Sequence, residues 1–323
     1  MNPIPILPGN AQHRGDRAEQ QDSFGFSDLL DLARQGALAV LADGMGGHAL
    51  GRAASQIAVK TFLDGYPHKL PDEPISATLR RLLQDANTAV RALAERQGER
   101  DNAGSTLAAA VIHQQHLYWI AVGDSRIYLY RAGQLMPLTE DHVYARELER
   151  AVAIGQMHAV EAADHPDREA LTSFLGVPEL ETIECNLQPV PLQSGDRVLL
   201  CSDGVYRALD ETELAEELAR PDPQVAAEAL AGRVLAGQIP HQDNLTVVIL
   251  AVGAAGDVQP RSTLRRRGGW IGLSAGLLLV SVVGATYWWW ERLRSETPTP
   301  AVPATSPVPA TLPPAPVQPV IRT

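Results

Sequence analysis

Hydrophobic residues follow two different patterns along the first 254 residues of this chain, which has 323 residues in all. Apolar residues at helical spacing predict a helix over residues 54–62, a longer helix after Asp72, and another helix over residues 226–234. Short apolar runs predict strands over residues 36–42, 105–113, 116–122, 125–130, 182–187, 197–201 and 244–252. The short links in the middle of this series predict antiparallel pairing. Because strands cluster instead of alternating one by one with helices, the pattern favours a layered α+β domain over a doubly wound parallel sheet.

A third pattern follows this region. Residues 268–290 contain no formal charge, and about 20 apolar residues suffice to span the hydrocarbon core of a bilayer as a helix. Tyr287 and the tryptophans at 288–290 lie at one end, where aromatic rings favour the membrane interface. A buried core helix is the alternative, but helices of this length in globular proteins usually carry charge on one face. We therefore expect a single transmembrane helix.

The charges that flank this segment predict its orientation. Four arginines precede it within residues 261–267 and two follow it within residues 292–294, and positive residues favour the cytoplasmic side. We therefore expect a domain over residues 1–255 in the cytoplasm, a basic juxtamembrane linker over 256–267, and single-pass anchoring in the inner (cytoplasmic) membrane. Residues 291–323 are rich in proline and predict a disordered tail, either an inert spacer or a contact for an envelope component.

Composition narrows the class of protein further. The formal net charge is −11, and residues after 256 carry seven arginines and three acids, so the first 256 residues carry −15. An acidic domain repels the phosphates of nucleic acid, and we expect no nucleic-acid partner. The two cysteines, Cys185 and Cys201, are too few for a disulfide framework or a cysteine-rich zinc site, and they suit a reducing compartment.

Aspartates recur where predicted strands meet small residues. Asp43 and Asp203 each end an apolar run and precede a glycine, while Asp243 precedes an apolar run. Asp124 and Asp22 lie in two further strings of this kind. Carboxylates that converge repel one another unless a cation joins them, and hard oxygen ligands suit Mg²⁺ or Mn²⁺. A single Asp-Gly pair is more often a turn than a ligand, so spacing alone leaves both interpretations open.

Taken in order, these strings resemble the metal-dependent protein serine/threonine phosphatases of the 2C type in their bacterial form. The resemblance covers about residues 10–252 and rests on the following strings: Arg17 with Gln21-Asp22, 42–48, 104–106, 122–126, 138–142, 200–204 and 243–246. It implies a four-layer sandwich of two antiparallel sheets flanked by helices. It also implies hydrolysis of phosphoserine and phosphothreonine in phosphorylated proteins, opposing a bacterial serine/threonine kinase.

The resemblance implies a set of metal ligands. Asp43 would bridge two Mn²⁺ or Mg²⁺ ions, and the backbone carbonyl of Gly44 would bind one of them. Asp203 and Asp243 would complete the protein share of this centre. Asp124, together with Asp203, matches the position that can hold a third, weaker ion.

The resemblance also implies the catalytic residues. Asp22 would accept hydrogen bonds from water on the ions, and Arg17 would bind the substrate phosphate with its planar guanidinium. Water activated by two cations would attack phosphorus directly, with no phosphoenzyme intermediate. Gln21 stands where many relatives carry an acid, and Met45 stands where eukaryotic relatives carry a general-acid histidine. His48 is then either a structural residue of the bacterial Gly-Gly-His turn or an acid.

Residues 143–172 match the flap beside the active site, the segment expected to affect substrate choice. Two further interpretations stay open. One is a catalytically silent, membrane-tethered phosphoprotein-binding module, which the presence of all three metal carboxylates disfavours. The other is an enzyme of the same fold that acts on one dedicated regulator.

Overall fold

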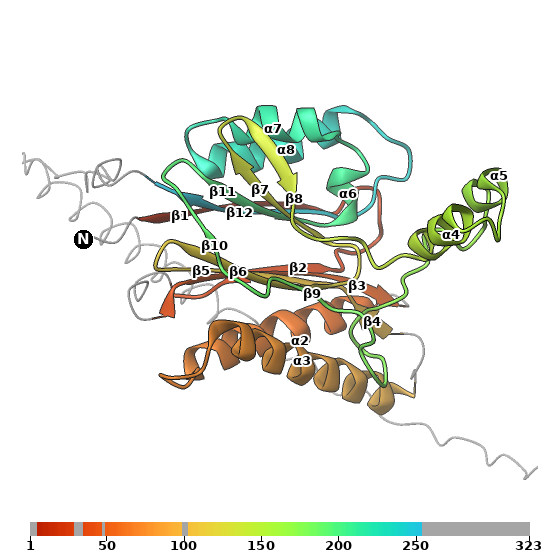
Figure 1. Ribbon diagram of the computed structural model, residues 1–323, viewed down its shortest axis with the longest axis horizontal. Coiled ribbons are helices and arrows are strands. Elements are labelled where there is room, and N and C mark those ends of the chain that lie inside the picture. Colours follow the sequence, from red (N-terminus) through yellow and green to blue (C-terminus); the bar gives the residue numbers. More distant parts are fainter. Residues whose placement is uncertain (1–4, 29–34, 47–48, 99–102, 254–323) are drawn as a thin grey trace, which may run out of the picture. The chain divides into compact units, whose positions relative to one another are not determined.

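The computed structural model describes residues 5–28, 35–46, 49–98 and 103–253. All of them lie in the first of the two units into which the chain divides, Met1–Arg261. Figure 1 shows four layers in this unit, in the order helices, sheet, sheet, helices. The predicted α+β fold with two antiparallel sheets and flanking helices is therefore confirmed.

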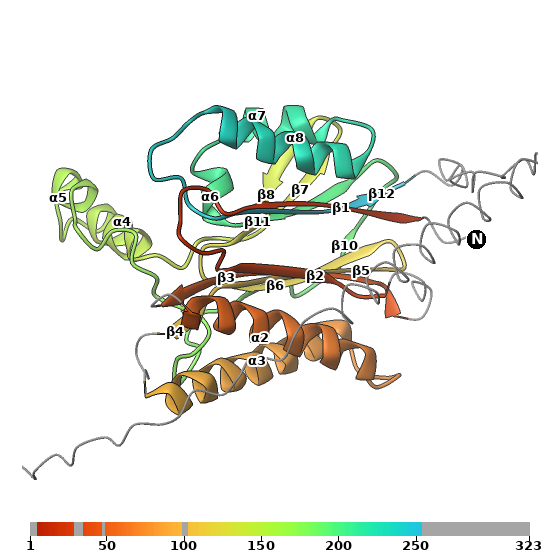
Figure 2. The ribbon, with the colours of Figure 1, turned by 180° about the vertical axis from the view of Figure 1, so that it is seen from behind.

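The first sheet contains five antiparallel strands in the order β1-β12-β11-β7-β8. Their bounds are Ile6–His13 (β1), Leu245–Val252 (β12), Arg197–Cys201 (β11), Arg126–Arg131 (β7) and Gln134–Pro137 (β8). Helices α7 (Glu211–Leu218) and α8 (Pro223–Ala236) cover the outer face of this sheet (Figure 1). Figure 2 shows β1 and β12 side by side, so the first and last strands of the domain pair with each other.

The second sheet contains seven strands, with the central order β10-β6-β5-β3-β2. The bounds are Val190–Pro191 (β10), His116–Val122 (β6), Leu107–His113 (β5), Ala37–Gly46 (β3), Asp22–Phe26 (β2), Ala103–Ser105 (β4, beside β3) and Glu184–Cys185 (β9, beside β6). Helices α2 (Ala49–Gly65) and α3 (Ile75–Gln97), joined through a 3₁₀ turn at Tyr66–His68, cover its outer face.

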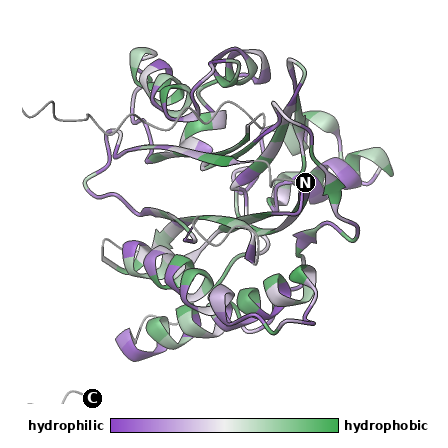
Figure 3. Ribbon diagram, turned by 90° about the vertical axis from the view of Figure 1, so that its left-hand side faces the viewer, coloured by the Kyte–Doolittle hydropathy of each residue, from purple (hydrophilic) through white to green (hydrophobic). Residues whose placement is uncertain are grey.

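The core consists of three apolar layers, one between the sheets and one beneath each pair of helices. Side chains alternate between these layers along each central strand, because successive side chains of a strand point to opposite faces. In β3, Leu38 and Val40 pack against the helices, while Ala39 and Leu41 pack between the sheets. Because both faces of these strands are buried, their sequences are continuous runs of apolar residues. Figure 3 shows this contrast, with hydrophobic residues along the sheets and mixed residues along the outer helices.

The segment 143–172 forms a projection at one edge of the sandwich (Figure 1). It carries helices α4 (Tyr144–Ala153) and α5 (Ala159–Ala163). Its two ends are joined at the base, where Val143 forms an isolated β-bridge with Leu171. This segment is the predicted flap.

Most predicted elements are present. The strand predicted over residues 182–187 is only two residues long, Glu184–Cys185, and strands β1, β2, β8 and β10 and helix α7 were not predicted. These four strands lie at sheet edges and are mostly exposed or partly buried, so they lack the apolar runs of the central strands. In the described residues no helix is long and apolar enough to cross a membrane. The segment predicted to do so, 268–290, lies outside them, as does His48.

Candidate metal centre and active site

The innermost part of the site is a pair of aspartates on neighbouring strands. Asp22 at the start of β2 lies directly opposite Asp43 of β3 in their antiparallel register. The end of β3 continues beyond this pair and is held by β4, with Gly44 opposite Ser105. Gly44 has no room for a side chain, because a Cβ there would lie 1.9 Å from the carbonyl oxygen of Gly51. The close packing of β3 on α2 therefore requires glycine directly after Asp43.

Asp22 connects the two sheets. Its Oδ2 accepts hydrogen bonds from Thr246 Oγ1 at 2.6 Å and from Ser202 Oγ at 2.8 Å, both of which belong to the first sheet or its end. Ser202 in turn accepts a hydrogen bond from the backbone N–H of Thr246. The other carboxylate oxygen, Asp22 Oδ1, is buried and has no hydrogen-bond partner. This oxygen is available to accept a hydrogen bond from water in the site.

Three further carboxylates reach the same end of the sandwich from loops and a short helix. Asp203 is the first residue of α6 (Asp203–Tyr206), which directly follows β11, and its Oδ1 is buried without a partner. Asp243 precedes β12, and its Oδ1 accepts a hydrogen bond from the N–H of Asn244 at 2.8 Å. Asp124 lies between β6 and β7 and is almost fully buried. All five aspartates predicted from the sequence are thus part of one region.

The pKa values of these carboxylates reflect their burial and their proximity to one another. Burial raises the pKa of Asp43 well above its usual range, and the negative charges of Asp22, Asp203, Asp124 and Asp243 raise it further. Burial also raises the pKa of Asp22 to about 6 and that of Asp203 to about 7. Divalent cations relieve such repulsion, so the donor set and the two unpartnered oxygens fit a metal centre.

Arginines hold the three outer carboxylates. Arg17 Nη2 lies 2.6 Å from Asp243 Oδ2. Arg207 contacts both Asp203 and Asp124 through its Nε and Nη2 atoms at 3.2 and 3.5 Å. Within the part of the chain that the structure describes, no three acidic, histidine or cysteine side chains form a closed ligand set. Asp243 must therefore release Arg17 to bind an ion through Oδ2, whereas Asp203 offers its unpartnered Oδ1.

The loop before β2 carries Arg17, and the side chain of Asn244 helps to fasten it to the Asp243 turn. Asn244 accepts a hydrogen bond from the N–H of Gln21 at 2.7 Å and donates to the carbonyls of Arg14 and Glu19 at 2.8 and 3.0 Å. The side chain of Asn244 thus orients the loop that carries Arg17. Arg17 itself is 57% exposed, and exposed ion pairs contribute only about 0–1 kcal/mol, so it exchanges partners readily.

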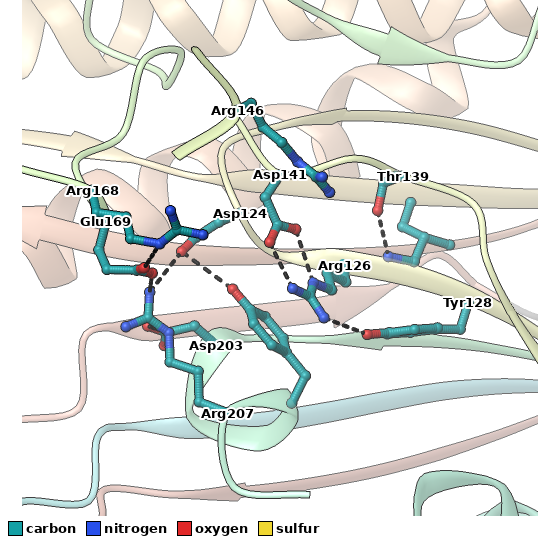
Figure 4. A network of polar contacts seen from close by, with 12 residues as sticks. Asp124, Arg126, Tyr128, Thr139, Asp141, Arg146, Arg168, Glu169, Asp203 and Arg207 are labelled. Atoms are coloured by element: carbon teal, nitrogen blue, oxygen red, sulfur yellow. Dashed lines mark hydrogen bonds and ion pairs between the residues drawn. The ribbon is translucent and has the colours of Figure 1, made fainter. Parts of the chain in front are cut away.

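A second polar network, which the sequence did not reveal, supports Asp124 (Figure 4). Arg126 binds both carboxylate oxygens of Asp141, at 2.9 and 2.7 Å, and its guanidinium lies 3.6 Å from the centre of the Tyr206 ring. The hydroxyl of Tyr206 donates to Asp124 Oδ2 at 3.3 Å. Arg126 and Asp141 belong to strings that carried the family resemblance, whereas Tyr206 and Arg207 carried no signal in the sequence.

The comparison with known proteins agrees with this fold and site. The sequence profile described as "Protein phosphatase 2C" matches residues 10–235. The chain belongs to the protein phosphatase 2C family. It is 34% identical over 248 residues to the serine/threonine phosphatase stp of Listeria monocytogenes, a match that covers 75% of this chain and 95% of that protein.

Two solved structures of related phosphatases show the same fold. The Mycobacterium tuberculosis serine/threonine phosphatase PstP/Ppp has a TM-score of 0.64 and 30% identity, and the match covers 77% of this chain and 99% of that one. A structure of the PstP catalytic domain in complex with two manganese ions has a TM-score of 0.61 and 30% identity over the same shares of both chains. In the second of these, the fold holds two ions.

Proposed function

We propose that this protein is a metal-dependent phosphatase that hydrolyses phosphoserine and phosphothreonine in phosphorylated proteins. The observation that carries the proposal is the convergence of five aspartates from five separate segments at one end of the sandwich, with raised pKa values for Asp22, Asp43 and Asp203 and two unpartnered oxygens. Relatives named serine/threonine phosphatases support the choice of substrate, and the two manganese ions in PstP support the choice of cofactor.

Two Mn²⁺ or Mg²⁺ ions would be held by residues at the ends of three strands. We assign Asp43 as the ligand that both ions share, with the carbonyl of Gly44 and the carboxylates of Asp203 and Asp243 as the remaining protein ligands. Bound there, the ions would lower the pKa of water and neutralise negative charge on the phosphate.

The chain's own residues would position the reactants. The hydroxyls of Thr246 and Ser202 fix one oxygen of Asp22, so its free Oδ1 is oriented to accept a hydrogen bond from the attacking water. Arg17 pairs with Asp243, and a cation on Asp243 would release the guanidinium for the substrate phosphate. A bidentate pair with phosphate suits the planar fork of arginine.

The test is Mn²⁺-dependent release of phosphate from a phosphothreonine peptide by residues 1–255. We expect full activity from this fragment, because every site residue precedes Val252, and no activity from its Asp43→Asn variant. Binding of the peptide without hydrolysis would favour the silent phosphoprotein-binding module instead. Comparison of phosphoproteins between wild-type and deletion strains separates a broad phosphatase from one with a dedicated regulator as substrate.

We further propose that residues 268–290 anchor the enzyme in the inner membrane, with residues 1–255 in the cytoplasm beside an ATP-using serine/threonine kinase. The proposal rests on the length of the charge-free segment and on the arginines that precede it. A reporter that works only outside the cytoplasm, fused to Thr323, should be active. A silent reporter there, together with an active cytoplasmic reporter at the same position, would show that the tail does not cross the membrane.

A further inference from the structure

Arg207 lies among carboxylates from three separate segments. Its Nε is 3.2 Å from Asp203 Oδ2, and its Nη2 is 3.5 Å from Asp124 Oδ2 and 3.2 Å from Glu169 Oε2. Figure 4 shows the guanidinium between these three groups. Asp203 follows a strand of the first sheet, Asp124 precedes another, and Glu169 belongs to the flap. The guanidinium of Arg207 thus connects two aspartates of the site with the flap.

The backbone fixes this placement. Asp203 is the first residue of α6, and the N–H of Arg207 donates to the Asp203 carbonyl at 3.0 Å, which closes a helical turn between them. Residues four apart on a helix are neighbours on its surface, so the Arg207 side chain emerges beside the Asp203 carboxylate. Asp124 is in turn held by the hydroxyl of Tyr206, the residue before Arg207.

This arrangement differs from the contact between Arg17 and Asp243. Arg17 is 57% exposed, extends from a loop, and contacts one carboxylate oxygen. Arg207 is itself 45% exposed, but it contacts three carboxylates, two of which have side chains only 9% and 14% exposed. A charge shared by several acidic groups, two of them largely buried, is harder to displace than a charge paired with a single carboxylate.

The residues around Asp124 therefore do not fit a third divalent ion. Arg207 already contacts Oδ2 of both carboxylates that such an ion would share, and the other oxygen of Asp203 is assigned to the two-ion centre. An ion beside the guanidinium would also be repelled by it, since like charges at short range oppose each other. In contrast, Asp22 and Asp43, with the free oxygen of Asp203, remain suited to the two-ion centre.

We propose that the guanidinium of Arg207 takes the place of the third ion and, through Glu169, links the flap to the metal centre. The inference rests on the proposed function, because it concerns the same centre. It assigns Arg207 as a positioning residue that supplies one fixed positive charge where the resemblance implies an exchangeable ion. The protein then needs two ions for its full charge balance at the site.

The experiment counts Mn²⁺ ions on the full-length chain in non-ionic detergent, using the electron paramagnetic resonance signal of free Mn²⁺. Wild type is compared with Arg207→Gln, which removes the charge but keeps a polar side chain, and with Arg207→Lys, which retains the charge. Arg168→Gln is the matched control, because Arg168 is also close to Glu169, at 3.9 Å, but contacts neither aspartate. Circular dichroism establishes that each variant is folded.

We expect two bound ions per chain in wild type, Arg207→Lys and Arg168→Gln. Arg207→Gln should bind a third ion, at least about tenfold more tightly than wild type does, which corresponds to about 1.4 kcal/mol. Three bound ions in wild type, or only two in folded Arg207→Gln, would overturn the inference. The proposed function would still stand in that case if wild type hydrolyses the phosphopeptide with Mn²⁺. No ions and no hydrolysis in folded wild type would overturn both.

Discussion

The five aspartates of the site fall into an inner pair and an outer trio that are built differently. The inner pair, Asp22 and Asp43, lies on adjacent strands, and Asp22 is held by hydroxyl groups. The outer trio, Asp124, Asp203 and Asp243, lies on turns and a short helix and is held by arginines. The sheets thus fix the inner pair whether or not ions are present, whereas the outer trio has alternative cations within its own chain. Metal should therefore separate Asp243 from Arg17 and leave the inner pair in place.

The largest effect is expected from the inner pair. Asp43→Asn removes the carboxylate assigned to both ions and should lower kcat at saturating Mn²⁺ by roughly a thousandfold or more, since metal stabilisation of the transition state is worth several kcal/mol. The metal-free fold should survive, because the change also removes repulsion with four neighbouring carboxylates. Phosphopeptide hydrolysis with Mn²⁺ measures the loss of kcat, and thermal unfolding in a chelator measures the stability of the metal-free fold. Near-normal hydrolysis by this variant would end the two-ion assignment.

The outer trio is tested next through Arg17. Arg17→Ala should lower kcat/KM by roughly ten- to a hundredfold, mainly through KM, because a charge-assisted contact is worth about 1.5–3 kcal/mol. Arg14→Ala is the matched control, since Arg14 belongs to the same loop but donates to the carbonyl of Ala18. Steady-state kinetics on a phosphothreonine peptide measures kcat and KM for both variants and wild type. Equal values for Arg17→Ala and wild type would place Arg17 outside the substrate site.

The hydroxyl contacts of the inner pair give a smaller effect, on stability. Ser202→Ala leaves Asp22 Oδ2 with one hydroxyl donor and the Thr246 N–H without its acceptor. Loss of these buried hydrogen bonds should reduce the free energy of unfolding by about 1–3 kcal/mol. Urea denaturation of the metal-free protein measures this loss. An unchanged midpoint would mean that the sheets alone hold Asp22.

The smallest effect concerns pH. Burial raises the folded-state pKa of Asp22 to about 6, above its ordinary value of 3.8, so the folded protein binds this proton more tightly than the unfolded chain does. This contribution is fully present below pH 3.8 and is lost as the pH rises through 6. In a chelator, the unfolding free energy of wild type should therefore fall more steeply from pH 4 to pH 6 than that of Asp22→Asn. Parallel pH profiles for the two proteins would contradict the raised pKa.

The sequence predicted the central strands, and with them Asp43 and Asp203, for the same reason, whereas Asp22 lies on β2, an edge strand that it did not predict. Strands buried on both faces carry long apolar runs, and β3 and β11 each deliver an aspartate at or just past the end of such a run. The edge strand β1 contains Pro8 and Gly9 in a partly buried setting, so it had no comparable pattern. The role of Arg207 could not be predicted from the sequence, because it depends on contacts with Asp124 and Glu169 that form only in the folded chain.

The pairing of β1 with β12 has a consequence for the order of events during synthesis. Asp22 depends on Thr246, which lies 224 positions further along, and β1 has β12 as its neighbour in the sheet. Domains fold while the ribosome is still adding residues, N-terminal parts first. Here the earliest strand has to wait for the latest one before the sheet is complete. A nascent chain that ends before Asp243 contains only four of the five aspartates. A chain that ends just after Asp243 contains all five but lacks Thr246, whose hydroxyl holds Asp22. We therefore expect activity to appear only after β12 has left the ribosome.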